Sequence, residues 1–196
     1  MMPSPFLTHL KSAAVVMALL AGTGALAYAL WSKPLLDAEE ALAAGHRELA
    51  LAAYGRAEDR FKRFPVAQRL LPRDYALSVS NQLALLYGSG DHDGVLAKAE
   101  AAPPRAAPRF WAGSSLFALA SAEARPDVRV VLLSRAQAEF KQALEQSPDD
   151  WDTKYNYEVT GRLVEALRKK PVEEPDTLMQ LVRPQQKQPK AVRKRG

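Results

Sequence analysis

The spacing of apolar and polar residues predicts helix along most of the chain. Alanine is abundant from residue 35 to residue 170, and no run of apolar and polar residues alternates as a strand would. Proline and glycine mark the breaks between helices. The predicted helices cover residues 36–64 (with a turn at 45–46), 74–87, 95–102, 110–124, 129–146 and 151–169. We therefore expect an all-α fold with short connections.

A separate apolar run lies near the N-terminus. Residues 12–32 carry no charge, and Lys11 and Lys33 bracket them. About 20 apolar residues are enough to span a bilayer as a helix. Tyr28 and Trp31 lie at the end of the run, where aromatic rings favour the membrane interface. This pattern predicts a transmembrane anchor within residues 1–34.

Two alternatives to the anchor stay open. Ala25-Leu26-Ala27 has the small-x-small form of a signal-peptidase site, so the run could be a cleaved signal peptide. A buried helix of a soluble protein would show the same composition. A short flank before a single apolar segment usually stays in the cytoplasm, so we expect residues 35–196 on the other side. The predicted location is a bacterial inner membrane, crossed once, with the helical region in the periplasm.

The region around residue 140 resembles a known repeat. Ala136, Phe140 and Ala143 fall on one helix face, and Pro148 stops that helix. Asp149-Asp150 can then cap the next helix. This order resembles the junction between two tetratricopeptide (TPR) units. The resemblance implies a TPR-like α-solenoid over residues 35–170. Matched positions 50, 95 and 136 are further apart than the 34 residues of a regular TPR unit. Another α-solenoid or a helical bundle therefore stays open.

The last predicted helix divides its aromatic residues between two expected roles. One i, i+4 stripe consists of Trp151, Tyr155, Val159, Leu163 and Leu167, which favours packing in the core, with the Trp151 ring near Phe140. Lys154 and Tyr157 lie off this stripe. We expect these two residues to contribute to a partner-binding groove.

Composition and charge add a basic tail. The chain is 47% hydrophobic and 25% charged, and it has no cysteine, which excludes disulfides and thiolate chemistry. Its net charge is +5. Residues 171–196 are predicted to be a disordered, Pro/Gln-rich tail. Its basic residues, among them Arg193, Lys194 and Arg195, could bind anionic lipid, an acidic protein surface or no partner. Nucleic acid is not expected outside the cytoplasm.

Catalytic and metal-binding patterns are weak. The sequence has no Gly-rich phosphate loop, and its three histidines are scattered. Asp91-His92-Asp93 favours a solvated turn over a metal site. Ser114-Ser115 favours a helix cap over a nucleophile. Residues 149–152 favour capping over paired acid–base chemistry. We expect no catalytic residue, no cofactor and no metal, although an unrecognised hydrolase stays open.

The segment Asp150-Trp151-Asp152-Thr153-Lys154-Tyr155-Asn156-Tyr157-Glu158 is similar to a family hallmark, Asp-Trp-Asp-Ala-Arg-Tyr-Asn-Leu-Glu, and matches it at six positions. The hallmark is that of membrane-anchored TPR-like proteins encoded beside MoxR-type AAA+ ATPases and von Willebrand factor A proteins, the MxaK-like group. The resemblance implies a non-catalytic adaptor that assists maturation of an exported enzyme together with those partners. The alternative is a scaffold subunit of an unrelated envelope complex, in secretion or cytochrome assembly.

Overall fold

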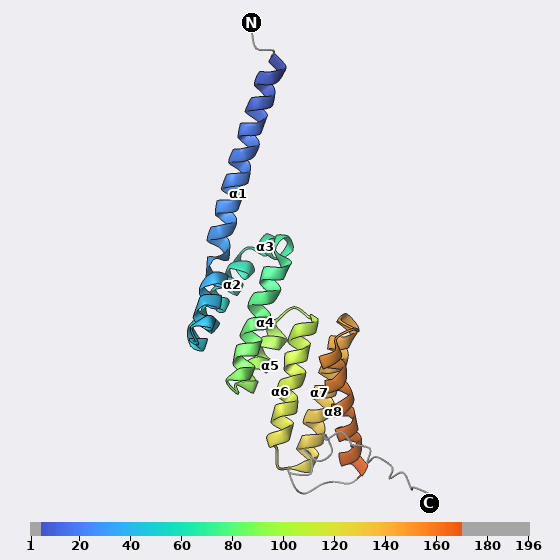
Figure 1. The fold of residues 1–196 in the computed structure, drawn as a ribbon. Helices are drawn as coiled ribbons and strands as arrows, with labels where there is room; N and C mark the ends of the chain where they lie inside the picture. Colours follow the sequence, from blue (N-terminus) through green and yellow to red (C-terminus); the bar gives the residue numbers. More distant parts are fainter. Residues whose placement is uncertain (1–4, 170–196) are drawn as a thin grey trace, which may run out of the picture. The chain divides into compact units, whose positions relative to one another are not determined.

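The computed structural model describes residues 5–169, and all regular structure in that range is α-helical (Figure 1). The chain divides into two compact units, residues 1–85 and 86–196. The helices are α1 (Pro5–Ala43), α2 (Arg47–Arg63), α3 (Pro65–Leu70), α4 (Pro72–Gly88), α5 (His92–Ala101), α6 (Ala106–Ala122), α7 (Pro126–Gln146) and α8 (Trp151–Lys169). The all-α prediction is confirmed.

Glycine and proline set the helix boundaries, as the sequence predicts. Gly45 and Gly90 adopt φ angles of 78° and 79°, a backbone conformation that costs glycine little, and each lies in the turn between two helices. Pro65 and Pro126 begin α3 and α7, where a missing backbone N–H leaves no helical bond unmade. Short turns therefore join consecutive helices.

The first helix continues through Pro34 instead of ending before it. Proline has no N–H to donate to the carbonyl four residues earlier, which belongs to Leu30. The Arg60 guanidinium of α2 replaces that donor, because its Nη1 lies 2.9 Å from the Leu30 carbonyl oxygen and 3.1 Å from that of Trp31. This bond allows α1 to remain one helix from the apolar run into the first unit.

Residues 14–30 of α1 are exposed along their whole length. In the described part of the chain, α1 is the one helix that is long and apolar enough to cross a membrane. The apolar N-terminal segment predicted from the sequence is thus a helix, compatible with either an anchor or a signal sequence.

The core of the first unit lies between the C-terminal part of α1, α2 and α4. Small side chains let α1 and α2 approach closely around the buried Tyr54. A polar network crosses from α2 to α4: Gln82 Nε2 donates to buried Glu58 Oε2 at 2.7 Å, and Lys62 Nζ lies 2.9 Å from Glu58 Oε1. The apolar core consists of Leu35, Ala38, Ala50, Ala53, Tyr54 and Ala57.

The second unit is built on α6, α7 and α8. Phe140 of α7 is buried against α6 at Gly113: a Cβ atom at residue 113 would lie 2.8 Å from two carbons of the Phe140 ring. Glycine at residue 113 therefore sets how closely α6 and α7 approach. Ser114 and Ser115 are buried inside α6, so the expectation that they cap a helix is wrong.

A buried arginine joins the end of α6 to the start of α7. Arg129 donates from Nε and Nη2 to the Glu123 carbonyl oxygen, at 2.9 and 2.5 Å. Glu123 is the C-cap residue of α6, where carbonyl groups lack helical donors and attract positive charge. Arg129 therefore fixes the turn between these two helices.

Candidate functional site

The start of α8 is held by an aspartate cap. Asp150 Oδ1 accepts from the backbone N–H groups of Asp152 and Thr153, at 3.1 and 3.4 Å. Asp150 Oδ2 accepts from the Thr153 hydroxyl at 2.8 Å. These bonds supply partners to N–H groups that a helix start otherwise leaves unpaired. The cap therefore stabilises the first turn of α8 and holds the side chains of that turn in defined positions.

That turn presents an aromatic cluster to solvent. Trp151 is 77% exposed and Tyr155 is 57% exposed. Lys154 places its Nζ 5.1 Å from the centroid of the Trp151 ring, a cation–π arrangement. Residues three and four apart share a helix face, so these side chains form one surface. We call Trp151, Lys154 and Tyr155 the Trp151 cluster.

The expectation that Trp151 and Tyr155 pack in the core is wrong. Each step of four residues turns the position around the helix by about 40°, because 3.6 residues complete a turn. A stripe of strict i+4 steps therefore crosses the buried face obliquely: Leu163 and Leu167 near its C-terminal end are buried, whereas Trp151 and Tyr155 at its start are exposed. The inward face of α8 alternates steps of four and three, and it consists of the buried Thr153, Thr160, Val164 and Leu167 and the half-buried Tyr157, with buried Leu163 beside it. Trp151 does not contact Phe140 in this arrangement.

Tyr157 takes the role that the sequence suggested for Trp151. It is half-buried and packs against the cluster of Leu116, Ala136 and Phe140. Lys154 is half-buried, and its Nζ lies over the Trp151 ring. Tyr157 therefore contributes to the packing of the unit and Lys154 to the Trp151 cluster, and their contribution to a partner-binding groove stays a prediction.

The remaining residues expected to be structural lie on α7 and in the turn after it. Ala136, Phe140 and Ala143 are buried on one face of α7. Pro148 lies in the turn between α7 and α8 and is exposed. The basic residues expected to bind a partner or lipid, Arg193, Lys194 and Arg195, lie outside the described residues.

The candidates for catalytic or metal chemistry have structural roles. Asp91 caps α5, with its Oδ1 accepting from the Gly94 N–H at 2.9 Å. The His92 ring lies 5.3 Å from that of Tyr87, edge to face. Within residues 5–169 no three His, Cys, Asp or Glu side chains lie where they could hold a metal ion.

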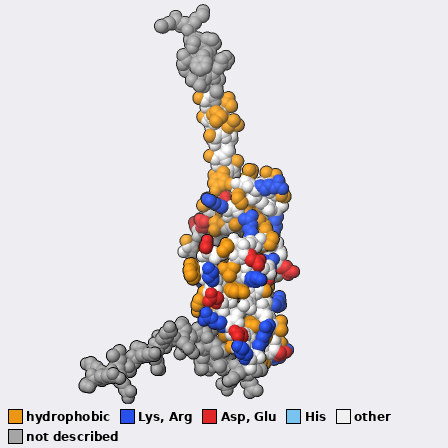
Figure 2. Space-filling view, turned by 90° about the vertical axis from the view of Figure 1, so that its right-hand side faces the viewer, with side chains coloured by type: hydrophobic (Ala, Val, Ile, Leu, Met, Phe, Trp, Pro, Cys, Tyr) orange, Lys and Arg blue, Asp and Glu red, His pale blue; other side chains and the backbone are white. Residues whose placement is uncertain are grey.

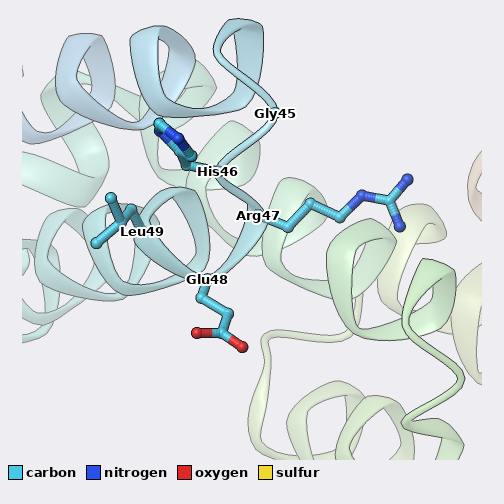
Figure 3. Close-up of a pocket in the computed structure, with 5 residues that line it drawn as sticks. All are labelled: Gly45, His46, Arg47, Glu48 and Leu49. Atoms are coloured by element: carbon cyan, nitrogen blue, oxygen red, sulfur yellow. The ribbon is translucent and has the colours of Figure 1, made fainter.

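A shallow depression lies beside the turn between α1 and α2 (Figure 3). The residues that line it, Gly45, His46, Arg47, Glu48 and Leu49, are all exposed. Figure 3 shows the side chains of Arg47 and Glu48 pointing away from each other and from His46. Because its polar groups diverge, the depression offers no common point of contact to a small molecule.

No family model, curated protein or solved structure matches this chain. Among the described residues, the exposed rings and the cation–π contact of the Trp151 cluster form the most distinctive surface feature.

Proposed function

We propose that the chain is a non-catalytic adaptor, anchored in a membrane by α1, that binds a protein partner through the Trp151 cluster. The observation that carries the proposal is the exposure of two aromatic rings on a capped helix start. Tryptophan is usually buried to a large extent in a folded monomer. Tryptophan and tyrosine are also the residues that most often dominate the binding energy of protein interfaces.

The structure of the cluster fits this role. Its rings are carried by a helix rather than a loop, so little conformational freedom is lost when a partner binds. Lys154 holds its charge against the Trp151 ring, which gives the surface both an apolar and a cationic component. Exposed Asp152 and Glu158 flank the cluster and would form part of a polar rim.

The anchor is supported by the exposed apolar length of α1. Residues 14–30 form no core, and an exposed apolar helix of this kind is stable when lipid covers it. On this proposal α1 keeps the first unit at the membrane surface. The helical pairs of the second unit then act as a TPR-like support for the cluster.

The partner follows from the resemblance of residues 150–158 to the MxaK-like hallmark. Trp151 and Tyr155, which match the hallmark, lie on the surface, and Asp150, which also matches it, caps the helix below them. In a recognition motif of this kind, the exposed rings would contact the partner and Asp150 would stabilise the helix that carries them. We propose a von Willebrand factor A-type protein or its MoxR-type AAA+ ATPase as the partner, in the maturation of an exported enzyme.

Co-purification of the tagged full chain with those two partners tests the proposal. The double variant Trp151→Ala/Tyr155→Ala should lose the partner. The control is Val131→Ala, which removes an exposed apolar side chain from α7 of the same unit. The control should keep the partner at the level of the unchanged chain.

A chain lacking residues 177–196 separates the cluster from the basic tail. The tail carries six Lys or Arg residues and no acid, so its contribution should fall as salt screens it. Loss of the partner on tail deletion, with the double variant still bound, would contradict recognition by the Trp151 cluster.

A further inference from the structure

The first unit carries an exposed apolar surface that the proposed function does not use. It is centred on α3, the short helix between α2 and α4. Leu70 is 74% exposed, Val66 is 65% exposed and Phe64, which precedes α3, is 53% exposed. We call Phe64, Val66 and Leu70 the α3 patch.

Two contacts place α3 beside the end of the apolar run of α1. Before α3, the Phe64 ring lies 5.8 Å from the Trp31 ring. After α3, the Tyr28 hydroxyl donates to Asp74 Oδ2 of α4 at 3.3 Å. Both flanks of α3 are therefore tied to residues 28–31, the segment in which the uncharged run ends. Figure 1 shows α3 next to the point at which α1 leaves the first unit.

The inner side of α3 is already used for packing. Gln68 Nε2 donates to the Phe61 carbonyl oxygen at 3.0 Å, and Ala67 is half-buried. This fixes which side of α3 faces outward, and that side carries Val66 and Leu70. The packing of the inner side of α3 therefore holds the α3 patch in a defined orientation on the first unit.

Basic residues surround the patch. Arg63, Arg69 and Arg73 are exposed around α3. Figure 2 shows hydrophobic and Lys or Arg side chains close together where α1 leaves the first unit. Apolar side chains flanked by arginines match the boundary between acyl chains and anionic headgroups, because arginine can extend its charge to the headgroups.

We propose that the α3 patch inserts into the membrane interface and that the occupant of this surface is a bilayer containing anionic lipid. This inference rests on the anchoring part of the proposed function. The patch then acts as a second attachment point beside α1. It fixes the tilt of the first unit against the membrane, which a single helix does not do.

Fluorescent labels at single cysteines test the inference, and the natural chain has no cysteine to remove. The full chain is reconstituted into vesicles of phosphatidylcholine and phosphatidylglycerol. An environment-sensitive dye is attached to Val66→Cys or Leu70→Cys. Leu49→Cys, at a similarly exposed leucine near the start of α2, is the matched control, and Leu20→Cys reports on the anchor itself.

We expect the labels at residues 66 and 70 to shift to shorter wavelength and to lose emission to a quencher attached near the lipid headgroup. The label at residue 49 should respond only to aqueous iodide, and the label at residue 20 only to a quencher deep in the acyl chains. Replacing phosphatidylglycerol by phosphatidylcholine should reduce the quenching at residues 66 and 70 and leave residue 20 unchanged.

Two outcomes would contradict the inference in different ways. If the label at residue 20 is quenched in the bilayer and the labels at residues 66 and 70 remain open to iodide, α1 is an anchor but the α3 patch does not insert into the membrane. The patch would then be exposed to solvent or bound by a protein. If residue 20 is also open to iodide, the anchor is absent, and the anchoring part of the proposed function fails together with this inference.

Discussion

The Arg60 guanidinium donates to the carbonyl oxygen of Leu30, 2.9 Å away. Pro34 leaves that carbonyl without its helical donor, so a side chain from α2 completes the backbone bonding of α1. The contact joins the apolar run to the first unit at the level of Trp31 and Phe64. It therefore couples the proposed membrane segment to the region that carries the α3 patch.

Arg60→Met should destabilise the first unit, because the Leu30 carbonyl then has no donor from the protein. A hydrogen bond from a charged group at a partly exposed site is worth about 1–2 kcal/mol. Pro34→Ala restores a backbone donor, so Arg60→Met should cost less in that background. Thermal unfolding of the four chains in detergent measures the coupling, and a cost that is equal in both backgrounds would contradict this role.

Gly113→Ala should destabilise the second unit, since the added Cβ would lie 2.8 Å from the buried Phe140 ring. Overpacking of a core costs about 1–3 kcal/mol, partly offset by the better helix propensity of alanine. Gly161→Ala is the matched control, because the added Cβ would meet only the flexible end of Gln137. Urea unfolding should show a lower free energy of unfolding for Gly113→Ala and no decrease for Gly161→Ala. In the Phe140→Leu background, Gly113→Ala should lower the free energy of unfolding by less. A decrease of the same size in that background would show that contact with the Phe140 ring is not the cause.

Arg129→Met should loosen the turn between α6 and α7. The variant loses both donors to the Glu123 carbonyl oxygen, at a cost of about 1.5–3 kcal/mol. Arg125→Met is the control: Arg125 is exposed and pairs with Glu123 only at the surface, so its loss should change stability by less than about 0.5 kcal/mol. Equal melting temperatures for the two variants would rule out a special role for Arg129.

Trp151→Ala should leave the free energy of unfolding nearly unchanged, within about 0.5 kcal/mol, because the ring is exposed. Asp150→Ala should cost more, about 0.5–2 kcal/mol, because it removes the cap of α8. Chemical unfolding of both variants gives the comparison. A large decrease in the free energy of unfolding on Trp151→Ala would contradict the exposed position of this ring and show that it packs in the core.

Helix positions could be predicted from the sequence because local chemistry sets them. Gly45 and Gly90 mark turns and Pro126 marks a break between helices, with no need of distant residues, but Pro65 indicates only a break although it begins α3. The all-α class follows from the same signals.

The contacts between helices could not be predicted in the same way. The strict i+4 stripe through Trp151 and Tyr155 pointed to the core because large rings outweighed the small Thr153 and Thr160 that α8 buries. The bond from Arg60 to Leu30 and the contact of Phe140 with Gly113 each join segments about 30 residues apart, and no local pattern predicts them. The α3 patch was missed because Pro65 and Pro72 indicated only an interruption.

On the proposed function, the Trp151 cluster is the surface that contacts the partner. The most direct measurement places a photo-crosslinking amino acid at residue 155 of the full chain in its native membrane, and at exposed residue 131 as the control. We predict a crosslink from residue 155 to the von Willebrand factor A-type protein or the AAA+ ATPase, and none from residue 131. Crosslinks to either protein from residue 131, with none from residue 155, would contradict it.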